Sequence, residues 1–298
     1  MISPEQSRLG AVIVPAHNEE AVVARTLAPL SDLATSGRIE LIVVANGCTD
    51  GTAQVARAVP GAQVLEVETA SKVAALNAGD SHASTWPRMY LDADIEITAV
   101  AVERVLSLLT AGPALAARPA FRYEATGATR VVRSFYRARQ RLPEISDHLW
   151  GAGVYALSKS GHERFDRFPE RVGDDLFVDG LFDRKEIEIV ATDPVLVRTP
   201  RDLKSLMAVL RRTHYGRAEA AKAENGEASR PTGRTTSGIA RQLLTTTFEP
   251  AADSAVYAGL VVAARLQLAR GRYAAWERDH SSRGGAASIE ETDSRSPV

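Results

Sequence analysis

The sequence contains little cysteine, little net charge and no long apolar run. Cys48 is the only cysteine among 298 residues, which excludes an intrachain disulfide and a zinc cluster made of cysteines. The longest uncharged apolar run, Ser254–Ala264, is shorter than the about 18 residues of a membrane-spanning helix, so a packed helix is expected there. The polar residues 1–10 contain no hydrophobic signal segment. These absences predict a cytoplasmic protein, with peripheral membrane contact through the late helix as the alternative.

Charge is balanced over the whole chain but not along it. The 36 lysines and arginines against 37 acids argue against wholesale nucleic-acid binding. Residues 40–100 hold eight acids and three bases, whereas residues 118–141 hold seven arginines and one acid. The arginine-rich stretch is interpreted as a solvated face, and binding of an anionic partner is the alternative.

Short β-rich runs alternate with helical stretches over the first hundred residues. The predicted strands are Ala11–Pro15, Glu40–Ala45, Gln63–Val67 and Met89–Asp92. The predicted helices are Glu20–Leu30, Thr52–Ala58 and Lys72–His82. Asn18 and Asp50 are expected to be N-caps of the first two helices. The alternation predicts a parallel sheet with right-handed crossovers, and ligands at the carboxyl ends of its strands.

The remaining chain is less regular. Further helices are expected at Ala99–Leu109, Thr129–Arg141, Asp174–Phe182, Asp202–Arg217 and Ala251–Arg270. Further strands are expected at Ala114–Arg118, Gly153–Ser158 and Glu186–Arg198, the last of them broken at Pro194. The polar stretch Ala223–Ser237 is expected to be mobile, and the tail from Ser281 to be disordered.

Asp92 and Asp94 close the fourth predicted strand. Their carboxylates suit Mg²⁺ or Mn²⁺, which keep coordination positions open for phosphate oxygens. A polar strand end with a helix cap is the alternative interpretation.

Other polar segments follow strands or begin helices. They are His17–Glu20, Asn46–Thr52, Lys72, Gly173–Asp175 and Arg211–Tyr215. Each has a structural alternative, which is a helix cap, a tight turn or a solvated basic surface. As functional groups, the paired carboxylates would accept a proton from a substrate hydroxyl, and the arginine and imidazole donors would bind a diphosphate.

The order of these segments resembles that of the family 2 glycosyltransferases. Seven elements carry the resemblance: Val12–Glu20, Val43–Thr52, Lys72–Gly79, Leu91–Asp94, Trp150–Gly153, Gly173–Asp175 and Leu210–Gly216. The resemblance implies the α/β GT-A fold, a mostly parallel central sheet flanked by helices, here with a helical C-terminal extension. The implied glycosyltransferase domain covers residues 1–217, with a nucleotide-sugar half at about 10–97 and an acceptor half at about 98–217. A mobile loop at 218–239, a helical segment at 240–280 and a disordered tail at 281–298 are expected to follow.

The resemblance also implies roles for single residues. Asp175 would be the general base, paired with Asp174, and Asp94 and His214 would hold Mg²⁺ or Mn²⁺. The acceptor side would be formed by Trp150, Gly151 and Ala152. The nucleotide sugar would be bound by Pro15, His17, Asn18, Glu19, Asn46, Asp50, Lys72, Asp92, Ala93, Arg212 and His214.

The implied activity is that of an inverting glycosyltransferase of the hexosyltransferase type. It would move a sugar from a nucleotide diphosphate donor to a hydroxyl of a glycan, a lipid carrier or a small molecule, with no nucleic-acid partner. Asn46 stands where the family usually has an acid that contacts the base, and Tyr215 replaces a tryptophan. A catalytically inactive binding module is therefore one alternative. A sugar-1-phosphate nucleotidyltransferase is another, although Pro15–Glu20 holds no glycine, lysine or arginine like that class's opening loop.

Overall fold

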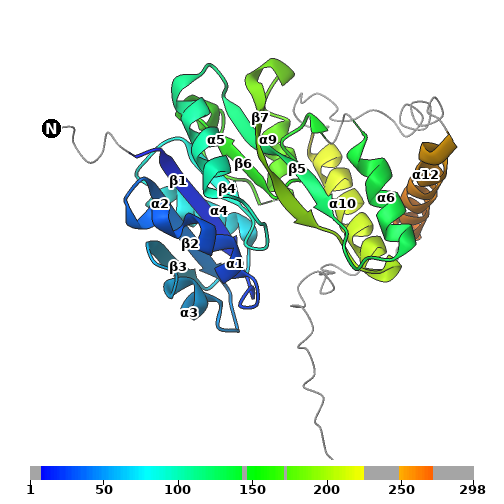
Figure 1. The fold of residues 1–298 in the computed structure, drawn as a ribbon, viewed down its shortest axis with the longest axis horizontal. Helices are drawn as coiled ribbons and strands as arrows, with labels where there is room; N and C mark the ends of the chain where they lie inside the picture. Colours follow the sequence, from blue (N-terminus) through cyan, green and yellow to red (C-terminus); the bar gives the residue numbers. More distant parts are fainter. Residues whose placement is uncertain (1–7, 143–145, 171–172, 225–247, 271–298) are drawn as a thin grey trace, which may run out of the picture.

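A seven-stranded sheet forms the centre of the computed structural model, which describes residues 8–142, 146–170, 173–224 and 248–270 (Figure 1). The strands are β1 (Gly10–Ala16), β2 (Ile39–Asn46), β3 (Ala62–Val67), β4 (Arg88–Leu91), β5 (Ala116–Glu124), β6 (Val154–Leu157) and β7 (Ile187–Arg198). Their order in the sheet is β3-β2-β1-β4-β6-β5-β7. Among these strands β6 alone runs antiparallel to its neighbours, β4 and β5, so the predicted mostly parallel sheet is confirmed.

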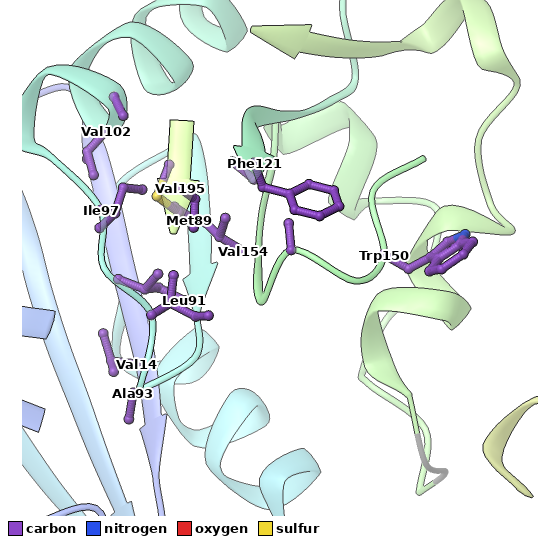
Figure 2. Close-up of a cluster of buried hydrophobic side chains, with 14 of the residues drawn as sticks. Val14, Met89, Leu91, Ala93, Ile97, Val102, Phe121, Trp150, Val154 and Val195 are labelled. Carbon is purple, nitrogen blue, oxygen red and sulfur yellow. The ribbon is translucent and has the colours of Figure 1, made fainter. Parts of the chain in front are cut away.

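Helices cover both faces of the sheet. They are α1 (Val23–Leu27), η2 (Ala28–Leu30), α2 (Ser31–Thr35), α3 (Thr52–Arg57), α4 (Lys72–His82), α5 (Ala99–Ala111), α6 (Arg130–Gln140), α8 (Lys159–His162), α9 (Asp174–Asp179), η3 (Arg184–Glu186), α10 (Leu203–Glu224) and α12 (Phe248–Ala269). Successive strand residues point to opposite faces, so Ile13 packs into the core under α4 and α9, and Val14 into the core under α1 and α5. Figure 2 shows part of this second core, with Met89 and Leu91 of β4 and Val102 of α5 among the labelled side chains.

The first predicted helix is replaced by two short pieces, α1 and η2, and a third piece, α2, follows beyond its predicted end. Glu20–Leu30 was expected to be one helix, but α1 is followed by the 3₁₀ turn η2 and then by α2. Pro29 lies in the first turn of η2, where its missing N–H and fixed φ interrupt the α-helical hydrogen bonds. The two N-cap predictions were wrong, because Val22 precedes α1 and Gly51 precedes α3.

The break predicted at Pro194 is an irregularity inside a continuous strand. β7 runs unbroken, but its pairing with β5 shifts between Pro119 and Phe121, which face Val190 and Val195. A proline cannot donate to a strand ladder, so the extra residues bulge out and pairing resumes beyond them. This resumed pairing is also why β5 extends to Glu124 rather than ending at Arg118.

The helical C-terminal extension packs against α6. Figure 1 shows α6, α10 and α12 side by side beyond β5. α10 continues to Glu224, so residues 218–224 are helical and not part of the predicted mobile loop, because alanine, glutamate and lysine favour helices. The rest of that loop, 225–239, and the predicted tail lie outside the described residues. Across the part of the chain that the structure describes, no helix has the length and hydrophobicity to cross a membrane.

Candidate functional site

A cleft of about 680 Å³ lies at the carboxyl ends of β1, β2 and β4, the edge where the sequence predicted ligands to bind. Most predicted site residues line it: Pro15, His17, Glu19, Asn46, Lys72, Asp92, Ala93, Asp94, Trp150, Gly151, Asp174, Asp175 and Arg212. Four predicted residues do not line it: Asn18, Asp50, Ala152 and His214.

Lys72 joins the two acidic segments of the cleft. It is the first residue of α4, and its Nζ lies 2.7 Å from Asp92 Oδ1 and 2.8 Å from Asp174 Oδ1. Burial favours the neutral amine, but the carboxylates of Asp174 and Asp92 outweigh it and raise the pKa of Lys72 above 10.5. Lys72 is therefore a fixed cation between residues that are 82 positions apart in the sequence.

The two carboxylates of the Asp174–Asp175 pair have different surroundings. Asp174 is buried, and besides Lys72 it accepts a hydrogen bond from the Tyr155 hydroxyl at 3.0 Å, so both of its oxygens are occupied. Asp175 is only half-buried and accepts hydrogen bonds from the backbone N–H groups of Gly151 and Leu176, each at 2.9 Å.

Burial, followed by the negative charge of Asp174, raises the pKa of Asp175 above its ordinary 3.8. A carboxylate with a raised pKa holds a proton more readily, which suits a general base. Asp174 therefore holds Lys72 in place, and Asp175 has surroundings that are compatible with this role.

Gly153 lets the carboxylates at the end of β4 approach the loop before β6. The Asp92 N–H donates to the Gly153 carbonyl at 2.8 Å, and Gly153 has a φ of +66°. A Cβ at this position would lie 2.6 Å from Ile95 Cγ1 and 3.2 Å from Asp92 Oδ2. Only glycine fits both the conformation and the space.

The aspartates at the end of β4 fit a hard divalent cation. Burial raises the pKa of Asp92 to about 6, with Lys72 opposing the shift and the neighbouring carboxylates adding to it. A bound cation would relieve the electrostatic repulsion between these neighbouring carboxylates. In the described ranges no three His, Cys, Asp or Glu side chains form a metal cluster. The site therefore suits an ion held by one or two carboxylates that takes its remaining ligands from phosphates and water.

The loops after β1 and β2 are tied together by polar contacts. Asn18, with a φ of 53°, accepts a hydrogen bond from the Thr49 N–H at 2.8 Å. Asp50 accepts from the Glu20 N–H at 3.3 Å and from the Thr52 N–H at 3.0 Å. These contacts explain why Asn18 and Asp50 lie outside the cleft: they join the loop after β1 to the loop after β2.

His17 and Asn46 lie where β1 and β2 end, and both line the cleft. His17 Nδ1 is 2.5 Å from the Asn46 carbonyl oxygen, so this nitrogen carries the proton. Asn46 itself is almost fully buried.

The α4 segment has two residues whose roles are structural. The Asn77 side chain donates to the Phe168 carbonyl at 3.1 Å and accepts from the Phe168 N–H at 2.9 Å. Gly79 faces β1, where a Cβ would overlap the Ile13 side chain. Close packing of α4 on β1 therefore places Lys72, at the start of the same helix, in the cleft.

The arginine-rich stretch is divided among three environments. Arg118 is fully buried and donates to the carbonyl groups of His148, Pro119 and Ser146, and burial lowers its pKa to about 10. Arg137 binds Asp253 of α12. Arg139 faces the cleft instead. The solvated-face interpretation is therefore wrong for Arg118 and Arg139, whereas Arg137 is exposed.

Sequence reasoning missed several residues that line the cleft. They include Arg25, Tyr123, Arg139, Tyr155 and Arg198. Helical spacing could have helped to separate the residues of a helix that face the cleft from those that do not. Residues two positions apart on a helix point to nearly opposite sides. The same rule accounts for Arg212 lining the cleft while His214, two positions further along α10, does not.

Solved structures of two glycosyltransferases have a fold similar to that of this chain. A mannosyltransferase from Pyrobaculum calidifontis, solved with GDP-Man and Mn²⁺, aligns over 91% of this chain and 89% of its own, with a TM-score of 0.59 and 18% identity. A glucosyl-3-phosphoglycerate synthase from Mycobacterium tuberculosis, solved with Mn²⁺, UDP-Glc and phosphoglyceric acid, aligns over 71% of this chain and 80% of its own, with a TM-score of 0.51 and 25% identity. The chain has the GT-A fold of these glycosyltransferases.

The family follows from a second comparison. Residues 11–157 match the family model described as Glycosyl transferase family 2. This segment of the chain belongs to that family, as the order of its motifs predicted. No curated protein matches the chain.

Proposed function

We propose that this family 2 glycosyltransferase transfers a hexose from a nucleotide diphosphate donor to an acceptor hydroxyl, with inversion at the anomeric carbon. The observation that carries the proposal is the difference between the surroundings of the two carboxylates in the acidic pair. Asp174 is occupied by Lys72 and Tyr155, whereas Asp175 lines the cleft beside the glycine-rich loop with a raised pKa.

The proposed reaction is a single displacement. The acceptor oxygen forms a bond to the anomeric carbon while the bond from that carbon to the diphosphate oxygen breaks. The electron pair leaves with the diphosphate, and Asp175 takes the proton of the acceptor hydroxyl. Attack from the face opposite the leaving group inverts the anomeric configuration.

The donor would occupy the side of the cleft nearest β1 and β2. Pro15, His17, Glu19 and Asn46 line that side, and Asn46 offers an amide in place of the acid usual in the family. Asn18 and Asp50 would act indirectly, by holding the donor-side loops. Trp150, Gly151 and the buried Ala152 belong to the acceptor-side loop.

Asp94 would hold Mg²⁺ or Mn²⁺, with Asp92 beside it and Lys72 neutralising the same cluster. When bound, the ion supplies positive charge to the leaving diphosphate. The synthase solved with Mn²⁺ and UDP-Glc supports this expectation. Arg212 of α10 would add a second cation to the diphosphate, and His214 stays a predicted metal ligand.

The alternatives differ in what they do with the donor. An inactive binding module would bind a nucleotide sugar without releasing the nucleoside diphosphate, whereas a nucleotidyltransferase would cleave within the diphosphate. The carboxylates in the cleft favour catalysis over binding alone. Localisation in the cytoplasm and peripheral membrane contact stay predictions.

The test is release of nucleoside diphosphate from a panel of nucleotide sugars, with Mn²⁺, with Mg²⁺ and with a chelator. We expect metal-dependent release of an intact nucleoside diphosphate from one donor, and an inverted anomeric configuration in the transferred or hydrolysed sugar by NMR. Binding without release, or release of sugar 1-phosphate, would contradict the proposal.

A further inference from the structure

One wall of the cleft is formed by α6, β7 and α10. The cleft-lining residues of these elements include Arg139, Arg198 and Arg212 and no acidic side chain. This wall differs from the end of β4, where the carboxylates gather.

Arg198 is already paired. Its Nε and Nη2 donate to Glu96 Oε1 at 2.9 and 2.6 Å, and Arg25 Nε lies 3.1 Å from the same oxygen. Glu96 is shared by two guanidinium groups, and Glu124 lies opposite Arg198 in the sheet, so Arg198 already has carboxylate partners within the protein.

Arg139 has no such partner. Its Nε donates to the Tyr123 hydroxyl at 2.7 Å, and within the described ranges no carboxylate lies at ion-pair distance from it. The side chain is half-buried. A cation removed from water without a counter-ion is unfavourable, so an anion supplied by a ligand would stabilise this arrangement.

Arg139 also lies beside the loop that holds the proposed base. Its Nη2 is 4.0 Å from the position of a Cβ on Gly151, the residue whose N–H binds Asp175. The tyrosine fixes one edge of the guanidinium, which leaves the fork of Nη donors for a planar or tetrahedral anion.

We propose that the acceptor carries a phosphate or carboxylate group, and that Arg139 binds this anion while Asp175 faces the acceptor hydroxyl. The inference rests on the proposed function, because it assigns the chemical class of the acceptor for that reaction. The acceptor would be a small hydroxylated phosphate ester or acid, and the arginine would select it over neutral alcohols. Binding of the donor diphosphate by Arg139 is the rival outcome.

The test is isothermal titration of the full chain, loaded with Mn²⁺ and the nucleoside diphosphate of its donor. Three probes of similar size are compared: glycerol 3-phosphate, D-glycerate and glycerol. The variants are Arg139→Gln, Arg139→Lys and the control Arg133→Gln, which removes an exposed charge from the same helix. Nucleoside diphosphate affinity and thermal unfolding are measured for each variant.

We expect at least one anionic probe to bind the wild type about tenfold or more tightly than glycerol, since hydrogen bonds to charged groups are the strong ones. Arg139→Gln should remove that preference, Arg139→Lys should keep part of it, and Arg133→Gln should leave it unchanged. The stronger of the two anionic probes identifies the group as phosphate or carboxylate.

The inference is overturned if neither anion binds more tightly than glycerol, or if folded Arg139→Gln keeps the preference. It is also overturned if Arg139→Gln loses nucleoside diphosphate affinity, because the arginine would then belong to the donor site. Failure of the wild type to bind any nucleoside diphosphate with metal would instead contradict the proposed function.

Discussion

At the scale of single residues, the site depends on unequal environments for similar side chains. Asp174 and Asp175 are neighbours in sequence, yet one is held by a lysine and a tyrosine and the other by backbone N–H groups. A lysine fixed by two carboxylates keeps its charge, and a carboxylate beside a buried carboxylate gains proton affinity. These differences give each residue a separate expected effect.

Asp175→Asn should lower the turnover number by about 10² to 10⁴, because an amide still accepts hydrogen bonds but takes no proton. Nucleoside diphosphate binding should remain. Asp174→Asn should in addition lower the thermal unfolding temperature, because Lys72 and Tyr155 lose a charged partner. Steady-state kinetics and thermal unfolding of both variants test this. Full turnover in Asp175→Asn, with loss only in a stable Asp174→Asn, would reverse the two roles.

The rate should fall on the acidic side at a pH above the ordinary aspartate value of 3.8, because the pKa of Asp175 is raised and the base acts only when unprotonated. In Asp174→Asn the neighbouring negative charge is removed, so the acid limb should move to lower pH. A profile of kcat/KM against pH for the wild type and this variant measures the shift. An acid limb at the same pH in both would mean that Asp175 is not the group that titrates.

At the scale of elements, the packing of helices on the sheet positions the side chains of the cleft. α4 brings Lys72 to the cleft because Gly79 allows the helix to approach β1. α12 completes the opposite end of the molecule, where Asp253 receives hydrogen bonds from Ser134 and Arg137 of α6.

Gly79→Ala should destabilise the protein by about 1 to 3 kcal/mol, because the added methyl overlaps Ile13. Gly259→Ala is the matched control: no atom lies within 4 Å of its Cβ position in α12, and alanine favours a helix by about 1 kcal/mol. Denaturant unfolding measures both free energies. Equal effects of the two substitutions would show that the approach of α4 to β1 is not close.

Asp253→Asn should lower the free energy of unfolding by about 1 to 3 kcal/mol, because a buried carboxylate loses its charge-assisted hydrogen bonds. Hydrogen bonds from Arg137, together with that from Ser134, lower the pKa of Asp253 below 3.8. Its contribution is therefore complete above pH 3.8 and is lost as the pH falls through the lowered value. When the free energy of unfolding is measured across this pH window, the values for the wild type and the variant should converge at acid pH.

The control for that experiment is Glu66→Gln, which removes an exposed ion pair with Arg57. Exposed pairs contribute at most about 1 kcal/mol, so a small effect is expected. A loss in Asp253→Asn no larger than in this control would show that α12 does not depend on the aspartate for docking.

At the scale of the whole molecule, ligand binding and folding are coupled. The cleft draws residues from both halves of the sheet and from α10, so a ligand that bridges them stabilises the complete fold. A nucleoside diphosphate with Mn²⁺ at 100 times its dissociation constant should add about 2.7 kcal/mol.

This stabilisation should require the metal and Asp94. The thermal unfolding temperature of the wild type should rise when nucleoside diphosphate and Mn²⁺ are both present, and should fall back when the metal is chelated. Asp94→Asn should fold normally but show only the metal-independent part of the shift, because a hard cation needs the charged oxygen. An undiminished metal-dependent shift in this variant would remove Asp94 from the metal site.

The sequence by itself determined the strands and the position of the cleft. Short β-rich runs predicted β1 to β4, and polar residues directly after three of them predicted the carboxylates and loops of the site. Both inferences depend on local patterns, because a strand's burial and the polar residue that follows it are set by adjacent positions.

The tertiary structure decided the surroundings and partners of each of these residues. Arg118, Arg137 and Arg139 belong to one basic stretch, yet they lie in the core, against α12 and in the cleft respectively. The insertion of β6 between β4 and β5 places Tyr155 against Asp174. Such partners lie far apart in the chain, and their contact depends on how helices and strands pack rather than on the local sequence, so the pattern alone could not identify them.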